Sequence, residues 1–339
     1  MSSRFTLRTA ALASGVATAS VTLLASTLTP VQAAPFSELD LDPYAGSFPI
    51  GVCTQTSPAI VNPTAVPMTP NGPAAASEAT ATSSYENNAD TTDTVTQTTK
   101  IALKSRATAV GNRPTSIALE ATGTASQTAS KPASACTPVT YVGARTNFVF
   151  TITEPTWASY SMARKGPMYT NVYFYIDNAE TYIDAYGRDV DGTTTGMYLL
   201  QPGEYDGYLE AEVRTRINTT SARKAKASVS LKFTPAGSAS AKPSGKASPY
   251  VTLPAARSCA THDATAKVTG KAKRAKKIAS ITYTVNGKKG ATLKGSKVTK
   301  SKATSLKIAD DKSAKIQATV KLKNGKKLTT KASYLACTA

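Results

Sequence analysis

The feature that most constrains the fold is a strict two-residue alternation near the C-terminus. From residue 314 to residue 323, Ala, Ile, Ala, Val and Leu take every second position, with Lys, Gln, Thr, Lys and Lys between them. Residues 280–285 repeat the pattern, with Ile, Tyr and Val alternating with Ser and Thr. Successive side chains of a strand point to opposite sides, so this period is typical of a strand with one buried face. The pattern predicts β-sheets with an apolar inner face and a polar outer face.

Both alternating segments run into the same tetrapeptide, Asn-Gly-Lys-Lys, at 286–289 and 324–327. Asn-Gly favours a tight turn because both residues tolerate positive φ. A one-residue slip would exchange the faces of a strand, so burial should decide the register. We therefore predict a β-bulge or a three-residue loop at both hairpins. The expected opposed pairs are Leu322 with Leu328 and Ile281 with Leu293.

Positive charge is concentrated at one end of the chain. The net charge is +19, and the residues from Arg257 onward contain 21 Lys and Arg against three Asp. The remainder has 19 basic and 18 acidic residues, so it is nearly neutral. The cationic character therefore belongs to a C-terminal module.

Four cysteines indicate disulfides in an exported chain. Three connectivities are possible, and we favour the sequential one, Cys53–Cys136 and Cys259–Cys337, because each pair brackets a segment of distinct composition. Loop-closure entropy gives each bridge a contribution of ~4–5 kcal/mol. No Cys-x-x-Cys spacing occurs, which favours structural over redox-active thiols.

Residues 1–34 read as a secretory signal peptide. Basic Arg4 and Arg8 precede a weakly apolar run over 10–28, and small residues end it, so cleavage is expected after Ala33 or Ala34. A membrane anchor is the alternative, but the run is short and interrupted by Ser and Thr. We expect a secreted, extracellular protein, free or attached to the cell wall, with no transmembrane segment in the mature chain.

The rest of the chain predicts an all-β protein with two or three antiparallel β-sandwich domains in tandem, of Ig-like or jelly-roll-like kind. Residues 35–136 form a Thr/Ala/Ser-rich β domain with an irregular lead-in and three long strands; a disordered stalk is the alternative. An aromatic-rich sandwich over 137–235 and a linker over 236–248 follow. A Lys-rich domain over 249–339 ends the chain.

Two segments resemble known domain families. Leu199–Tyr205 (Leu-Leu-Gln-Pro-Gly-Glu-Tyr) is similar to bacterial pre-peptidase C-terminal domains, which are non-catalytic appendages of exported proteins. Cys259, Val285-Asn286-Gly287 and Cys337 resemble the Ig-like domains that end many secreted actinobacterial proteins. These resemblances imply β folds, export and a bridge from the first strand to the C-terminus.

The sequence offers no convincing catalytic centre, cofactor site or metal site. His262 is the single histidine, so neither a Ser-His-Asp relay nor a histidine metal cluster is expected. The acids of 177–191 could bind calcium, although a solvated loop is the simpler interpretation. A carboxylate pair for glycoside hydrolysis needs only two acids at suitable separation, and it stays open as a less favoured alternative.

The lysines carry the functional hypothesis. Alternation predicts that those of 314–331 share an outer sheet face near the lysines of the other hairpin, giving this candidate polyanion site: Lys288, Lys289, Lys315, Lys321, Lys323, Lys327 and Lys331. Clustered like charges favour polyanions through counterion release. Lysine predominates over arginine and no aromatics interleave, which disfavours specific nucleic-acid recognition. We expect a non-enzymatic binding or adhesion protein for anionic polysaccharide, teichoic acid or glycosaminoglycan. The alternative is a structural protein whose lysines serve solubility and protect sheet edges.

Overall fold

The computed structural model describes residues 34–57, 63–188, 191–215 and 223–339. The predicted signal peptide lies outside the described residues except for Ala34. Up to residue 235 the described chain is built from strands alone. They are β1 Phe36–Phe48, β2 Cys53–Ser57, β3 Val66–Pro67, β4 Ala75–Asn87, β5 Asp90–Val110, β6 Arg113–Ala129, β7 Val139–Ile152, β8 Thr156–Lys165, β9 Tyr169–Asp177, β10 Tyr182–Arg188, β11 Gly192–Leu200, β12 Gly203–Thr215 and β13 Arg223–Pro235.

The elements after residue 235 are shorter. They are β14 Val251–Thr252, β15 Asp263–Val268, α1 Ala272–Ala275, β16 Ile278–Val285, β17 Lys288–Lys294, a 3₁₀ turn Gly295–Lys297, β18 Ala303–Lys307, β19 Ala314–Leu322 and β20 Lys327–Tyr334. The predicted all-β class is confirmed. Within the described residues, no helix is long and apolar enough to cross a membrane.

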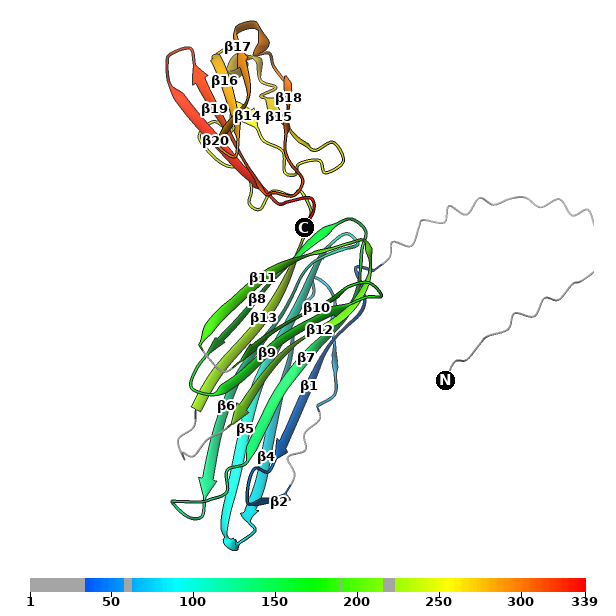
Figure 1. Ribbon diagram of the computed structural model, residues 1–339, viewed down its shortest axis with the longest axis vertical. Helices are drawn as coiled ribbons and strands as arrows, with labels where there is room; N and C mark the ends of the chain where they lie inside the picture. Colours follow the sequence, from blue (N-terminus) through cyan, green and yellow to red (C-terminus); the bar gives the residue numbers. More distant parts are fainter. Residues whose placement is uncertain (1–33, 58–62, 189–190, 216–222) are drawn as a thin grey trace, which may run out of the picture. The chain divides into compact units, whose positions relative to one another are not determined.

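The strands up to β13 form two large antiparallel sheets. One has six strands in the order β10-β9-β12-β7-β1-β3, and the other has seven in the order β11-β8-β13-β6-β5-β4-β2 (Figure 1). Both sheets supply inward side chains to one hydrophobic cluster, with Phe148 and Phe150 from the six-stranded sheet and Leu119 and Leu231 from the other. The buried Ser105 and Thr146 hydroxyls, one from each sheet, lie 2.7 Å apart and form a hydrogen bond across the core.

The structure differs from the predicted division at residue 136. β1 lies before that position and pairs with β7 after it, while β6 before it pairs with β13 after it. Both sheets therefore mix strands from 35–136 and 137–235, so the predicted boundary falls inside both sheets. The physical reason is that Thr- and Ala-rich strands bury little area alone, and aromatic residues from the second segment complete their core.

The three long strands expected in the first segment are present as β4, β5 and β6. The two connections between these strands are Asn88-Ala89 and Gly111-Asn112, which contain residue types that favour turns. In β5, alternate side chains from Asp93 to Ala109 are buried, so the two-residue period holds for nearly the whole strand. Most of these buried side chains are small or polar, which explains why the period is hard to see in the sequence.

The predicted irregular lead-in is wrong for residues 36–48, which form the long strand β1. This strand pairs with β7 over most of its length and with the two-residue β3 on its other side. Pro43 suggested irregular chain, yet a proline is tolerated where the neighbouring strand is so short. Buried Leu41 and Pro43 alternate with polar Asp40 and Asp42, and this period was the overlooked signal.

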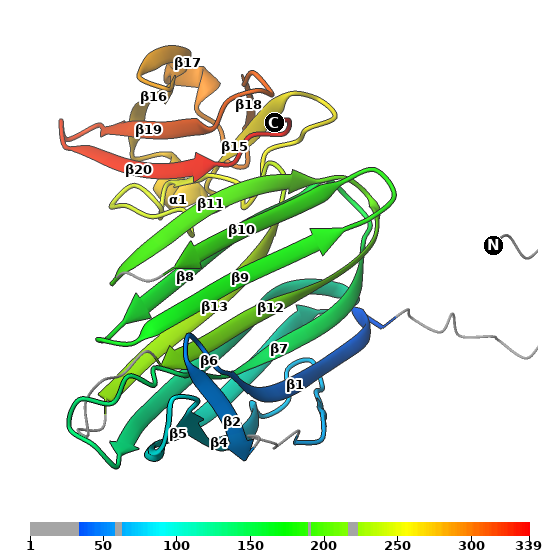
Figure 2. The same ribbon diagram turned by 60° about the horizontal axis from the view of Figure 1, so that its bottom comes forward.

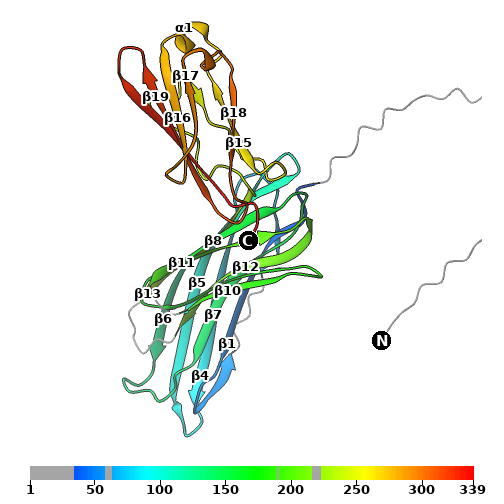
Figure 3. The ribbon, with the colours of Figure 1, turned by 45° about the horizontal axis from the view of Figure 1, so that its top comes forward.

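The C-terminal module, residues 236–339, has its own core between a three-stranded sheet, β14-β15-β18, and a four-stranded sheet, β17-β16-β19-β20 (Figure 3). Ile281, Ile316 and Val320 are fully buried in it. Residues 236–248, predicted as a linker, lie along this module, since Ala239 bridges to Tyr334 and Ser244 to Lys331. Backbone hydrogen bonds to β20 thus order a segment whose composition is typical of flexible chain.

The two hairpins follow the predicted parity. At the first, Ile281 lies opposite Leu293, and one residue of β17 is bulged past a two-residue Asn286-Gly287 turn. At the second, Lys321 lies opposite Lys327, and the Leu322 amide donates to the Lys326 carbonyl across a three-residue loop. The bulge and the odd loop are as predicted. The pairing of Leu322 with Leu328 is wrong, because Val320 takes the place opposite Leu328.

The cysteines are bonded sequentially, Cys53 to Cys136 and Cys259 to Cys337. The first bridge joins a small cluster with buried Tyr85 and Val95. The second joins the segment between β14 and β15 to the last residues of the C-terminal module. Two disulfides indicate an oxidising environment.

Candidate functional site

The outer face of the four-stranded sheet carries rows of lysine and threonine. Ladder pairing places Lys294, Ser280, Lys321 and Lys327 side by side across β17, β16, β19 and β20. The row next to it is threonine throughout: Thr292, Thr282, Thr319 and Thr329. The third row runs Lys289, Thr284, Gln317 and Lys331, and Lys315 lies opposite Ser333 beyond it. We call Lys289, Lys294, Lys315, Lys321, Lys327 and Lys331 the lysine face.

Five of the seven predicted lysines lie on this face, and the other two, Lys288 and Lys323, do not. Lys288 is paired with Val285 on the other parity of the hairpin. Lys323 follows the last residue of β19, where its amide donates to the Lys277 carbonyl. Lys294 belongs to the face and was missed, because its strand was not counted among those with clear alternation.

The lysine face holds its charges close together without acidic neighbours. Lys321 and Lys327 are directly opposed, an arrangement of like charges that destabilises a strand pair. Residues 236–339 contain 23 Lys and Arg and three Asp, while 34–235 contain 15 basic and 18 acidic residues. Among the described residues, no lysine of the face forms an ion pair. Exposed lysines such as Lys271 and Lys302 lie elsewhere on the module, so positive charge also extends beyond the face.

The histidine and the acidic loop show ordinary structural contacts. His262 Nδ1 lies 2.5 Å from Asp310 Oδ2. Asp177 accepts a hydrogen bond from the Tyr175 hydroxyl at 2.8 Å, and Asp191 accepts one from the Gly166 amide at 2.7 Å. Asp189 of the suggested calcium loop lies outside the described residues. Over the ranges that the structure describes, no group of three His, Cys, Asp or Glu side chains could hold a metal ion.

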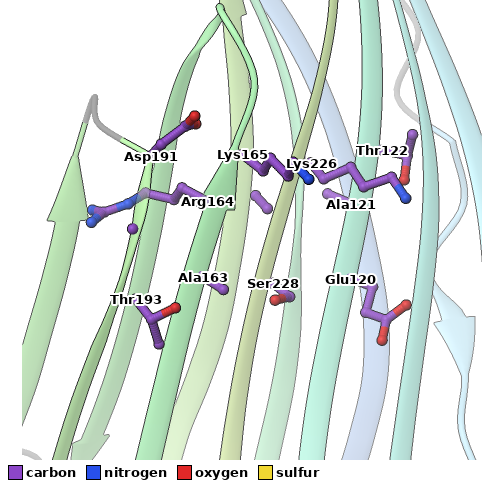
Figure 4. A pocket seen from close by; sticks show the side chains of 12 residues that line it. Glu120, Ala121, Thr122, Ala163, Arg164, Lys165, Asp191, Thr193, Lys226 and Ser228 are labelled. Atoms are coloured by element: carbon purple, nitrogen blue, oxygen red, sulfur yellow. The ribbon is translucent and has the colours of Figure 1, made fainter.

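A groove of about 610 Å³ crosses the outer face of the seven-stranded sheet at β11, β8, β13 and β6. Figure 4 shows Glu120, Ser228, Ala163 and Thr193 in one row, beside a row with Lys165 and Lys226. The groove's two carboxylates, Glu120 and Asp191, lie at opposite ends. It therefore brings together no carboxylate pair for hydrolysis.

A second surface, which the sequence analysis missed, lies on the outer face of the six-stranded sheet across β10, β9, β12, β7 and β1 (Figure 2). We call it the tyrosine–carboxylate face. Its aromatic residues are Phe48, Tyr44, Tyr141, Tyr169, Tyr173, Tyr175, Tyr182, Tyr186 and Tyr208, and its acids are Glu38, Asp40, Asp42, Asp177, Asp184, Glu204, Asp206, Glu210 and Glu212. The available signal was the shared parity of Tyr and acid within each strand, as in Asp206, Tyr208 and Glu210.

The polar groups of this face are held in a hydrogen-bonded network. The Tyr44 hydroxyl donates to Glu210 Oε1 at 2.9 Å and lies 3.3 Å from Glu212 Oε2. Glu210 also accepts from Arg145 Nε at 2.8 Å. Burial, followed by the two carboxylates, raises the pKa of Tyr44 well above its ordinary range, so its hydroxyl stays protonated and donating.

No protein-family model and no curated protein matches this sequence. Among solved structures, the chain is similar to the adhesin domain of Epf from Streptococcus pyogenes. The two are 11% identical over 87% of this chain and 92% of that chain, with a TM-score of 0.19. At that TM-score the likeness carries no argument about function.

Proposed function

We propose that the protein is a secreted, non-enzymatic binding protein that attaches to anionic polymers through the lysine face. The ligand class is an anionic polysaccharide, a teichoic acid or a glycosaminoglycan. The single observation behind the proposal is that lysines of β17, β19 and β20 lie on one face of the four-stranded sheet with no acid among them.

The clustered lysines lower the stability of the sheet, and a bound polyanion offsets that cost. Opposed like charges lower the stability of the sheet, so their density is not explained by folding. A polymer with regularly spaced anions neutralises several lysines at once and releases its condensed counterions. The hydroxyls of Thr282, Thr319 and Thr329, which lie between the lysine rows, offer hydrogen bonds to the same sulfates, phosphates or carboxylates.

Two other functions remain as alternatives. β17 is an edge strand of its sheet, and the lysines on it hinder edge-to-edge aggregation. A structural protein whose lysines only keep it soluble would have the same composition. A carboxylate-dependent hydrolase in residues 137–235 is the less supported alternative. Turnover of a polysaccharide, abolished by a single Asp or Glu substitution there, would establish it.

The test compares two lysine variants of the chain from residue 34 onward on immobilised heparin and on purified bacterial cell walls. The first replaces Lys315, Lys321, Lys327 and Lys331 by Gln. The matched control replaces Lys271, Lys273, Lys300 and Lys302, which are exposed elsewhere on the module. Both variants lose four charges, so net charge alone predicts the same effect on each.

Binding through the face predicts weaker retention for the first variant than for the control. The slope of log affinity against log salt should fall by about one for each contacting lysine removed. Equal weakening in both variants would point to nonspecific charge. No retention of the wild-type chain at low salt would leave solubility as the role of the lysines.

A further inference from the structure

The tyrosine–carboxylate face brings together residues from four separate stretches of sequence. Two neighbouring rows across the sheet illustrate it, and each places two adjacent tyrosines beside polar side chains. One row runs Asp184, Tyr175, Tyr208, Asn147 and Asp40, and the next runs Tyr186, Tyr173, Glu210, Arg145 and Asp42.

The rings form a continuous series rather than isolated contacts. Tyr208 lies between Tyr173 and Tyr175, with ring centroids 5.6 Å and 5.5 Å away. Tyr175 continues to Tyr182 at 5.5 Å, and Tyr173 to Tyr186 at 6.3 Å. Tyr182 is 66% exposed and Tyr186 51% exposed, so the outer end of this series is open to solvent.

A second group of rings lies on β7 and β1, over glycines. A Cβ at Gly46 would come within 2.3 Å of the Tyr141 ring, and one at Gly143 within 2.7 Å of the Tyr44 hydroxyl. Only glycine therefore lets these two rings lie across the strands. Phe48, 38% exposed, packs against Tyr141 with centroids 6.0 Å apart.

Between the two ring groups lies a preorganised polar cluster. Glu212 is only 4% exposed, and its Oε1 accepts from Asn171 Nδ2 at 2.7 Å and from Arg214. The Tyr186 hydroxyl donates to Asn171 Oδ1 at 2.9 Å, which links the cluster to the open end of the ring series. The Arg145 guanidinium lies 4.7 Å from the centre of the Tyr208 ring. Donors and acceptors are thus fixed beside aromatic faces before any ligand arrives.

We propose that the tyrosine–carboxylate face is a second binding site, for a neutral oligosaccharide. A sugar ring presents C–H groups on its faces and hydroxyls at its rim. The C–H groups suit the electron-rich face of a tyrosine, and the hydroxyls, which donate and accept, suit interleaved carboxylate, amide and guanidinium groups. Tyrosines also lose little conformational entropy on binding, because they have two rotatable side-chain bonds.

The charge and composition of the face argue against other occupants. Among the described side chains of the face, carboxylates outnumber guanidinium groups, so a nucleic acid or another polyanion is repelled despite the stacking surfaces. Among the described residues of the face, the exposed large apolar ones are all aromatic, namely Phe48, Tyr169, Tyr182 and Tyr186. The lysine-rich module of a second copy of this chain is attracted to these carboxylates. That attraction is weakened because Glu210 and Glu212 already form ion pairs with Arg145 and Arg214.

The test uses the chain from residue 34 onward in native affinity gels that contain a neutral polysaccharide. The probes are hydroxyethyl cellulose, xylan, mannan, dextran and a soluble β-1,3-glucan. We expect at least one of them to retard the protein equally at low and high salt. The double variant Tyr182→Ala/Tyr186→Ala should weaken binding tenfold or more.

The control is Tyr198→Ala on β11, which removes another exposed tyrosine and should leave retardation unchanged. Thermal unfolding of both variants checks that they remain folded. The four-lysine variant of the lysine face should bind the polysaccharide normally, so failure of either site is seen separately. Three outcomes would overturn the proposal: no retardation by any probe, retardation lost at high salt, or concentration-dependent self-association that Tyr182→Ala/Tyr186→Ala abolishes.

Discussion

At the residue scale, Arg257 is a buried cation satisfied by main-chain groups. It is 4% exposed, and its guanidinium donates to the carbonyls of Leu335, Ala309, Asp310 and Lys312 at 2.7 to 3.1 Å. It therefore ties the loop before β19 to the residues after β20. Burial lowers the pKa of this guanidinium, but arginine stays charged at any physiological pH.

We expect Arg257→Lys to destabilise the C-terminal module by about 3 kcal/mol, because an ammonium group cannot reach all four carbonyls and those left are buried unpaired. Amide hydrogen exchange in β19 and β20 measures the effect. Arg274→Lys, in the exposed α1 turn, is the matched control and should change exchange little. Equal exchange in the two variants would contradict this role for Arg257.

Tyr283 gives a prediction about alkaline pH. Its side chain is fully buried, and burial raises its pKa to about 12. A raised folded pKa stabilises the protein below the unfolded value of about 10, and the contribution is lost as pH rises toward 12. Between those pH values the wild-type module should lose roughly 2 kcal/mol that Tyr283→Phe does not lose. Urea unfolding of both proteins along a pH series tests this; parallel stability curves would refute it.

At the element scale, the two Asn-Gly-Lys-Lys hairpins have different turns despite identical sequence. Asn286 has φ of 49°, and its Oδ1 accepts a hydrogen bond from the Lys315 amide at 2.7 Å. Asn324 instead accepts from Lys326 within its own loop at 3.2 Å. The first turn is thus fastened to the start of β19, and the second is not.

Asn286→Ala should cost about 1–2 kcal/mol, because it loses that hydrogen bond and strains a left-handed residue. Asn286→Gly also loses the hydrogen bond, but glycine adopts positive φ without strain. It should therefore destabilise the module less than Asn286→Ala does. Asn324→Ala is the control from the matching position and should cost at most about 1 kcal/mol. Urea midpoints rank the three variants, and an equal or larger loss at Asn324 would be inconsistent with the proposed fastening.

The strands with large apolar residues were predictable from the sequence, because Ile101, Leu103, Ile316 and Val320 set the two-residue period directly. The strand β1 was not predictable, because only a few of its residues show the two-residue period and Pro43 lies among them. The pairing at the second hairpin was missed for a different reason. Parity fixes which face Leu322 takes, but the loop length that selects its partner depends on local turn geometry.

At the scale of the whole molecule, we expect the two disulfides to contribute unequally to the stability of the fold. The Cys259–Cys337 bridge has a sequence separation of 78 residues and closes the part of the C-terminal module that holds β15 to β20, and the core of this module is small. The Cys53–Cys136 bridge lies beside a minor cluster at one end of two large sheets. Small cores depend more on covalent restraints than large ones.

Replacing Cys259 and Cys337 by Ser should lower the stability of the module by ~4–5 kcal/mol and raise its hydrogen exchange throughout. β5 and β6 should keep their protection. Replacing Cys53 and Cys136 is the comparison, and it should raise exchange mainly in β2 and the adjoining end of β4. Global loss of protection in the second variant, with none in the first, would reverse this assignment.

Local sequence is enough to show that the chain forms strands, which residues face inward where large apolar residues recur, and that positive charge gathers at the C-terminal end. Those properties depend on neighbours in sequence, through the two-residue period and the local composition. Local sequence does not show that 35–136 and 137–235 share both sheets, or that Tyr44, Tyr175, Tyr186 and Tyr208 lie on one surface; the fold establishes both. Strand partners are chosen by core packing over long sequence separations, so the lysine face, built from neighbouring hairpins, could be anticipated and the tyrosine–carboxylate face could not.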